Sequence, residues 1–375
     1  MSNRKFLLGE LMVTKKYELV GNGVKEKILD GTYKINDKLP TESELMSMYD
    51  VSRYTVRRAM SDLENEHYVY RIQGGGMFVN DWRSAEENNN TNQMIGIITT
   101  HIADYIFPNI ISGADQIISD NGFGLALSNT HNDPKRERKA LMSILNSNVV
   151  GLIVEPTRST MPASNLDLYL QIEQKRLPMV FINAQYPNLN AVSVTTDDFK
   201  GVKKLTEYLF SIGHRRILGV FQVDDQQGMD RMAGFTAAFQ AASGLELNSS
   251  VIMYQSSDHR KNILAQVEDY LNLNVARRPT AIVCYNDELA FQVVDSVKSE
   301  DLSVPDDISI TGFDNYYLGE YFDPTLTTLT HEKEKMGHDA ANLLISMLHH
   351  KKVSSIVYEP DLLIRNSTKA TSKNK

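Results

Sequence analysis

The chain of 375 residues has a single cysteine, Cys284, and no long hydrophobic run. One cysteine excludes a disulfide framework and a cysteine-rich zinc site, and its place in the apolar stretch 281–285 predicts a buried strand thiol. Residues 1–13 lack the hydrophobic core and the cleavage site of a signal peptide. No stretch approaches the roughly 20 apolar residues that a membrane helix needs. We therefore expect a cytoplasmic protein that makes no contact with membranes.

The sequence also lacks the motifs of common enzyme classes. It contains no Gly-x-Ser-x-Gly elbow, no phosphate-binding Walker loop and no His-Glu-x-x-His zinc motif. The glycine pairs at 21–23 and 122–124 lack the third glycine of a dinucleotide-binding fingerprint. The run 349–352, His-His-Lys-Lys, fits the C-terminus of a helix, where cations are favourable, better than a metal site. We expect no catalytic residues, no metal and no cofactor.

A general excess of positive charge is missing as well. The net charge is −8. Residues 1–80 hold 12 Lys and Arg against 11 Asp and Glu, which leaves about −9 on the remaining residues. Affinity for nucleic acid must therefore come from local arginines, and it should depend strongly on salt because bound counterions are released.

Residues 51–60 are the most informative stretch, because they hold three arginines and no acidic residue. If this stretch is a helix, its spacing places four apolar side chains on one face, namely Val56, Ala59, Met60 and Leu63. It gathers on the opposite face Tyr54, Arg57, Arg58 and Ser61. An apolar face backing an exposed face of this composition is what a helix in the major groove of DNA requires.

The neighbouring segments favour the same interpretation. Thr41 and Glu44 form a capping box that predicts a helix over 42–49, and Ser52 is placed to cap the next helix. Two short helices joined by a tight turn make a helix-turn-helix. Residues 67–72 and 77–80 read as two strands around a glycine run, which predicts a hairpin beside the second helix.

The motifs Leu39–Leu45, Val51–Ala59 and Gln73–Val79 resemble the GntR family of bacterial winged-helix regulators, over roughly residues 15–80. The resemblance implies DNA contacts from Lys16, Glu42, Arg53, Thr55, Arg57, Gln73 and Gly75. An acidic residue such as Glu42 either accepts from cytosine N4 or only complements the helix dipole.

Four features depart from the family pattern. Gly21 and Gly23 interrupt the expected first helix, which we predict to begin near Val24. His67 stands where the family has glycine, and Met77 replaces a threonine of the wing. Translation starts at either Met1 or Met12, since the first eleven residues precede the usual family start.

The rest of the chain alternates between short apolar strands and amphipathic helices. Residues 81–93 are polar and rich in asparagine, which predicts a flexible linker between a head at 1–80 and a body at 94–375. We predict strands at 94–100, 125–129, 150–155, 179–184, 217–221, 251–254, 281–285 and 308–313. Among the helices between them are 133–146 and 197–212. This α/β pattern predicts parallel sheets, and the break near 185–197 predicts two lobes.

Polar and aromatic side chains follow these strands, at the sheet edge where α/β proteins bind ligands. Carboxylates and amides can bind the hydroxyls of a sugar, and aromatic rings can pack on its C–H surface. Such residues also commonly cap the next helix, so no single one identifies a site.

Four segments of the body resemble the LacI/GalR family of sugar-sensing repressor cores, namely 151–156, 231–235, 281–290 and 308–315. The resemblance implies a two-lobed core like periplasmic sugar-binding proteins. It implies effector contacts from Tyr105, Phe107, Glu155, Asn183, Arg231, Asn286, Asp314 and His331. Weaker candidates are Asn129, His131 and Lys333.

A GntR-type head on a LacI/GalR-type core resembles a group of sugar-responsive repressors from Gram-positive bacteria. The combination implies a homodimer that binds a palindromic operator and is released by a monosaccharide inducer, L-arabinose. Spacing and composition do not distinguish L-arabinose from another sugar, nor inducer from corepressor. The rivals from other classes are a sugar-binding protein without DNA affinity and a sugar-modifying enzyme.

Overall fold

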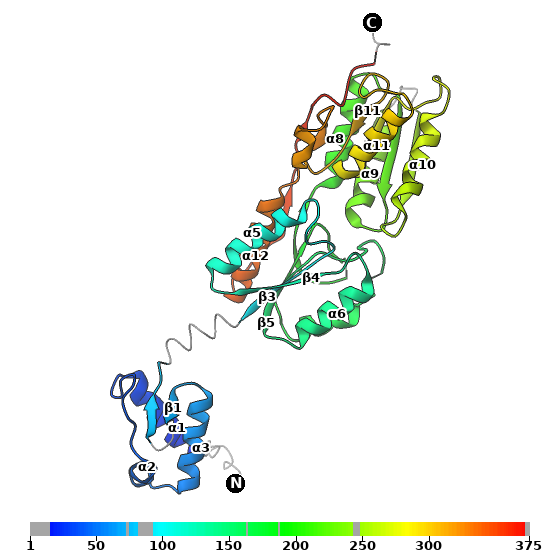
Figure 1. Cartoon of the computed structure of the whole chain (residues 1–375). Helices are drawn as coiled ribbons and strands as arrows, with labels where there is room; N and C mark the ends of the chain where they lie inside the picture. Colours follow the sequence, from blue (N-terminus) through cyan, green and yellow to red (C-terminus); the bar gives the residue numbers. More distant parts are fainter. Residues whose placement is uncertain are drawn as a thin grey trace, which may run out of the picture. The chain divides into compact units, whose positions relative to one another are not determined.

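A computed structural model describes residues 16–72, 75–81, 93–162, 164–186, 188–242 and 248–371. The chain forms two compact units, Met1–Asn92 and Gln93–Lys375, which we call the head and the core (Figure 1). The predicted linker 81–93 lies outside the described residues except at its two ends. Within the described part of the chain, no helix is long and apolar enough to cross a membrane.

The head consists of helices α1 (Lys16–Leu29), α2 (Glu42–Tyr49) and α3 (Arg53–Asn65), followed by the antiparallel hairpin of β1 (Val69–Ile72) and β2 (Gly76–Val79). The predicted capping box is confirmed: Glu44 N donates to Thr41 Oγ1, and Thr41 N donates to the Glu44 carboxylate. Ser52 caps α3 as predicted.

The predicted start of the first helix near Val24 is wrong, because α1 runs unbroken through both glycines. Gly21 faces open space. Gly23 is required by packing, since a Cβ there would lie 2.6 Å from the Tyr49 hydroxyl at the end of α2. Tertiary contact thus outweighs the low helix propensity of glycine.

The end of α3 shows which backbone conformation residue 67 must adopt. His67 adopts a left-handed φ of 61°. Its N–H donates to Glu64 O at 3.1 Å, and Tyr68 N donates to Leu63 O at 3.0 Å. These two hydrogen bonds form a Schellman motif, in which glycine avoids the steric cost of a Cβ.

The core has two lobes, each a parallel sheet covered by helices on both faces. The first sheet has the order β13-β7-β6-β5-β3-β4. Its strands are β3 (Met94–Thr99), β4 (Gly124–Asn129), β5 (Val149–Val154), β6 (Met179–Ile182), β7 (Val192–Thr196) and β13 (Ile356–Tyr358). Helices α5 (Phe107–Asp120) and α12 (Lys333–Leu348) cover one face. The other face is covered by α6 (Pro134–Leu145) and α7 (Leu166–Gln174).

The second sheet has the order β11-β10-β8-β9. Its strands are β8 (Arg216–Gln222), β9 (Asn248–Tyr254), β10 (Ala281–Cys284) and β11 (Ser309–Thr311). The helices of this lobe are α8 (Asp198–Ser211), α9 (Gln226–Ala241), α10 (Arg260–Leu271) and α11 (Asp287–Ser299). The turn η1 (Tyr317–Glu320) and the pair β12 (Thr328–Leu329) and β14 (Leu362–Leu363) complete it. Cys284 is buried in β10.

All eight predicted strands of the core are present, but the break at 185–197 contains a strand that sequence reasoning missed. This strand, β7, pairs with β6 and belongs to the first sheet. The chain then crosses to the second lobe at α8, returns between β12 and α12, and crosses again between β13 and β14. The chain therefore passes between the lobes three times, next to the edge of the first sheet that contains β7 and β13.

We expect His67→Gly to raise the free energy of unfolding of the head by about 1 kcal/mol, because it removes the cost of a Cβ in the left-handed region. Urea denaturation of the full chain, followed through the transition of the head, measures this change. His67→Ala keeps the Cβ and should give no gain. Equal stability of the glycine and alanine variants would contradict the explanation.

Candidate functional site

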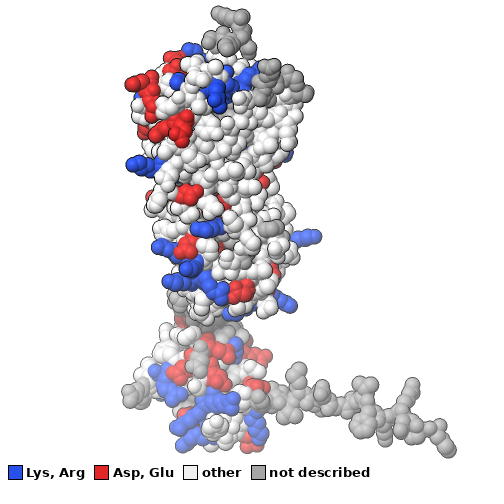
Figure 2. Space-filling view, turned by 90° about the vertical axis from the view of Figure 1, so that its right-hand side faces the viewer, with Lys and Arg blue, Asp and Glu red and all other residues white. Residues whose placement is uncertain are grey.

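The exposed face of α3 carries the predicted DNA-contacting residues. Arg53, Tyr54 and Arg57 are exposed, Tyr54 by 74%. The opposite face is buried in the head and consists of Val56, Ala59, Met60 and Leu63. Figure 2 shows basic side chains gathered at one end of the head, whereas basic and acidic groups are mixed over the core.

Glu42 holds two of the three exposed arginines of α3, Arg53 and Arg57. Arg57 Nε donates to both carboxylate oxygens of Glu42, at 2.9 and 3.1 Å. Arg53 Nε lies 3.7 Å from the same carboxylate. Among the residues that the structure describes, Arg57 makes side-chain hydrogen bonds through Nε alone, so its terminal nitrogens are available to donate to guanine or phosphate. Glu42 is therefore placed to orient arginines, which is a third role beside base contact and helix capping.

The other predicted DNA residues lie at the start of α3, at the start of α1 and in the hairpin. Thr55 is half-buried in the first turn of α3 and bonds Ser52 through its hydroxyl at 2.8 Å. Lys16 is exposed at the start of α1. Gly75 closes the hairpin turn, where its N–H donates to Ile72 O. Gln73 lies outside the described residues.

Glu42→Ala should weaken operator binding by about 1–3 kcal/mol, and Arg57→Ala should do the same. If Glu42 acts by orienting Arg57, the variant that carries both substitutions loses clearly less binding free energy than the sum of the losses in the two single variants. Fluorescence anisotropy on operator DNA selected from a random pool measures all three affinities. Glu66→Ala, which breaks the exposed pair with Lys25 elsewhere in the head, is the control. Additive losses would show that Glu42 contacts DNA independently.

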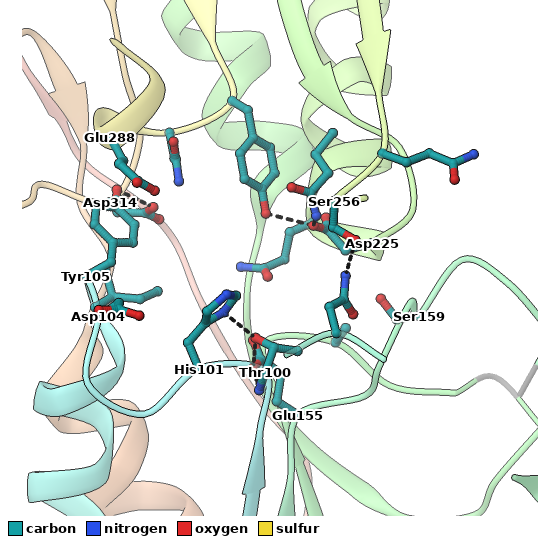
Figure 3. Close-up of a pocket in the computed structure, with 18 of the residues that line it drawn as sticks. Thr100, His101, Asp104, Tyr105, Glu155, Ser159, Asp225, Ser256, Glu288 and Asp314 are labelled. Carbon is teal, nitrogen blue, oxygen red and sulfur yellow. Dashed lines mark hydrogen bonds between the residues drawn. The ribbon is translucent and has the colours of Figure 1, made fainter. Parts of the chain in front are cut away.

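A cavity of about 320 Å³ lies between the two lobes of the core, at the carboxyl ends of their strands. Six of the predicted effector residues line it: Tyr105, Phe107, Glu155, Arg231, Asn286 and Asp314. Figure 3 shows Tyr105, Asp104, Asp314 and Glu288 along one wall and Asp225, Ser256 and Ser159 along the other, with Thr100, His101 and Glu155 below.

Arg231 is the cationic centre of this site and is 1% exposed. Its Nε donates to Asp198 at 2.7 Å and Nη1 to Tyr285 O at 2.7 Å, while Nη2 lies 3.4 Å from Asp314. The guanidinium stacks on the Phe313 ring at 3.7 Å. Burial acts to lower the pKa of Arg231, but the charges of Asp198 and Asp314 raise it above its ordinary value. Burial raises the pKa of Asp198 to about 7 in spite of the arginine.

Glu155 forms the opposite pole of the cavity. One carboxylate oxygen accepts from Thr100 N at 2.8 Å and from Thr100 Oγ1 at 2.6 Å, and the other accepts from Asn183 at 2.9 Å. Burial raises the pKa of Glu155, and these hydrogen bonds oppose the rise. The carboxylate is fixed by the protein and keeps lone pairs for a ligand hydroxyl.

Tyr105 joins the two lobes. Its hydroxyl donates to Asp314 at 2.7 Å and accepts from Asp287 N at 3.2 Å. Burial and then the charge of Asp314 raise the pKa of Tyr105, so it remains a neutral donor. Asn286 caps α11 by accepting from Leu289 N and also lines the cavity. Helix capping and ligand contact are therefore not exclusive here.

The remaining candidates do not line the cavity. Asn183 lies behind Glu155, and Asn129 accepts from His131 N within its own loop. Lys333 donates to Asp314 O and Asn315 O. His331 is buried 3.9 Å from Asp314, and burial lowers its pKa to about 4, so it is neutral.

Sequence reasoning missed several residues of the cavity wall, of which Asp225 is the most informative. It caps α9 through Gly228 N at 2.6 Å and accepts from the Tyr285 hydroxyl at 2.8 Å. Burial raises the pKa of Asp225 to about 6. Asp225, Asn132, Ser159 and Ser256 all lie a few residues beyond the ends of strands. Extending the search by four residues past the end of each predicted strand would have found them.

Arg231→Met should lower the free energy of unfolding of the core by about 3 kcal/mol, because Asp198 and Asp314 would share a buried site without their cation. Adding Asp198→Asn should recover part of the loss. Urea denaturation followed by circular dichroism tests both variants. Arg138→Met, which breaks the exposed pair with Asp167, should cost no more than about 1 kcal/mol. A core that keeps full stability without Arg231 would contradict this account.

Two family profiles match the chain. One, described as bacterial regulatory proteins of the gntR family, matches residues 16–79. The other, described as a periplasmic binding protein-like domain, matches residues 206–368. Each coincides with a part of the chain in which the structure places a candidate site.

Relatives cover nearly the full chain. The arabinose metabolism transcriptional repressor of Geobacillus stearothermophilus is 39% identical over 94% of this chain and 98% of its own length. The repressor of the same name from Halalkalibacterium halodurans is 38% identical over 96% and 98%. Among solved structures, the periplasmic binding protein/LacI transcriptional regulator from Alkaliphilus metalliredigens, complexed with D-xylulofuranose, is 25% identical. It matches with a TM-score of 0.63 over 73% of this chain and 98% of its own.

Proposed function

The chain belongs to the arabinose metabolism transcriptional repressors, and we propose that L-arabinose in the cleft of the core releases it from operator DNA. The protein is a sugar-responsive DNA-binding repressor and not an enzyme. Binding to chromosomal operators puts its proposed site of action in the cytoplasm. The observation that carries the proposal is the cavity in which Arg231, Glu155 and Asp314 converge between two lobes.

The charge of the cavity wall favours a neutral sugar over a sugar phosphate. Two arginines line the cavity, Arg231 and Arg260. The acidic residues of the wall are Asp104, Glu155, Asp225, Asp258, Glu288 and Asp314. Arg231 is already paired with two carboxylates, so a phosphate would meet net negative charge. Hydroxyl groups, in contrast, can donate to these carboxylates at no electrostatic cost.

Release of DNA follows from thermodynamic linkage. A sugar that favours the form with low DNA affinity must itself bind more weakly to the DNA-bound protein, by the same factor. We expect the two lobes to change their relative position when the sugar binds. Tyr105 of the first lobe donates a hydrogen bond to Asp314 of the second lobe, so such a change would act on this contact. Closure of the lobes around the sugar would stabilise this contact.

We also propose a homodimer. Tyr317, Leu318 and Tyr321 form an exposed apolar strip on the second lobe, with exposures of 63%, 40% and 81%. Large aromatic side chains are enriched in the buried centres of protein interfaces. A symmetric pair of heads would then match a palindromic operator.

Isothermal titration calorimetry with L-arabinose, D-xylose, D-ribose, D-galactose and ribose 5-phosphate tests the effector. We expect binding of L-arabinose, and affinity for ribose 5-phosphate lower by about 100-fold or more, because the cavity wall is acidic. An operator-release assay with the sugar that binds decides whether this sugar acts as an inducer or as a corepressor. If the sugar tightens DNA binding, it is a corepressor. If none of the five compounds binds, the effector assignment is refuted.

A further inference from the structure

Four loops from the two lobes are bonded to one another beside the cavity. From the first lobe come the loops after β4 and β5, with Asn132 and residues 158–160. From the second lobe come the loops after β8 and β9, with residues 223–226 and Ser256. We call this group of contacts the interlobe latch.

The centre of the latch is Asp224, which is fully buried. Its carboxylate accepts from Ser256 N at 3.0 Å and from Ser256 Oγ at 2.6 Å. Ser256 Oγ in turn accepts from Asn132 Nδ2 of the other lobe at 2.9 Å. Arg158 Nε lies 4.0 Å from the Asp224 carboxylate. A chain of polar contacts thus runs across the lobes without a gap.

Two further hydrogen bonds cross the lobes at adjacent residues. Ser159 Oγ accepts from Gln226 N at 2.8 Å, so a side chain of the first lobe satisfies a free N–H at the start of α9. Thr160 Oγ1 donates to Val223 O at 3.0 Å. Opening the lobes would break both bonds and expose these backbone groups to water.

The backbone of the latch is held in an unfavourable conformation. Asn132 has a φ of 53° and Arg158 a φ of 46°, both in the left-handed region. Arg158 N donates to Asn132 Oδ1 at 2.8 Å and thereby ties the two strained residues together. Strain of this kind persists where surrounding contacts fix it, and it is concentrated at binding clamps and switches.

The sheet order places two of the latch loops, those after β4 and β9, away from the crossings between the lobes. The crossings adjoin β7 and β13 at one edge of the first sheet, whereas β4 is the opposite edge, and β9 is an edge of the second sheet. Tyr105 and Asp314 lie along the other wall of the cavity (Figure 3). Asn132, Ser159 and Ser256 line the cavity, but Arg158 and Thr160 do not.

We propose that the interlobe latch controls the rate of effector exchange, with Arg158 and Thr160 as positioning residues that do not touch the effector. The Arg158 side chain donates from Nε to Asn132 O at 3.3 Å and faces Asp224 of the other lobe, and Thr160 holds the loop after β8. The contacts form only when the lobes are closed, so they stabilise the closed form and slow escape. The identity of the effector in this proposal rests on the proposed function.

The test compares Arg158→Ala and Thr160→Val with the unaltered protein in the full chain. Stopped-flow tyrosine fluorescence gives the rate constants for association and dissociation of L-arabinose. We expect dissociation to become about tenfold faster in each variant while association does not slow, since loss of one cross-lobe contact of about 1.4 kcal/mol has that effect. Thr160→Ser keeps the hydroxyl and should retain the original rates.

Arg138→Ala is the matched control, because it breaks an ion pair within the first lobe alone. Hydrogen exchange without sugar is the second measurement. Arg158→Ala should increase exchange in segments 222–228 and 254–258 of the other lobe, and Arg138→Ala should not. If the unaltered protein binds no L-arabinose, the effector assignment fails and hydrogen exchange alone decides the latch. Unchanged exchange in the second lobe, or unchanged dissociation in both variants, overturns the latch.

Discussion

The core depends on one buried cation. Arg231 is surrounded by Asp198, the Tyr285 carbonyl, Asp314 and the Phe313 ring, which come from three separate segments of the second lobe. A buried charge is tolerated only where it is paired and hydrogen-bonded, so these segments must meet at one point. Asp314 also binds Tyr105 of the first lobe. The same charge network that satisfies Arg231 thereby sets how the two lobes meet around the cavity.

The cavity and the latch share an origin in the parallel sheets. Each strand ends at the same edge, and the loop that follows it is free of the hydrogen-bond pattern of the sheet. Polar residues in these loops first satisfy the next helix, as Asp225 and Asn286 do, and then face the opposite lobe. The lobes face each other through these edges. Neighbouring residues in the loops therefore cap helices, line the cavity and contact the opposite lobe.

Local signals predicted the head and the strands well, and failed where long-range contact decided the outcome. The capping box of Thr41 and Glu44 needs only adjacent residues, and it was confirmed. In α1, Gly23 leaves room for the Tyr49 ring of α2, and this partner lies outside the sequence of α1. The strand β7 was missed because its short, threonine-rich sequence gains stability from its pairing with β6 and β13. The placement of Asn183 and His331 behind the cavity wall likewise followed from packing.

The sequence by itself determined the winged-helix head, the alternation of strands and helices, and the residue types at the strand ends. It did so because periodicity, capping and strand-end chemistry are properties of short segments. Only the tertiary structure decided that Glu42 holds Arg57, that Arg231 binds Asp198, and that Asp224 and Arg158 face each other across the lobes. These partners are 15, 33 and 66 residues apart in the printed numbering, and no local pattern links them. Their meeting is set by the order of strands in two sheets, which a segment of sequence does not encode alone.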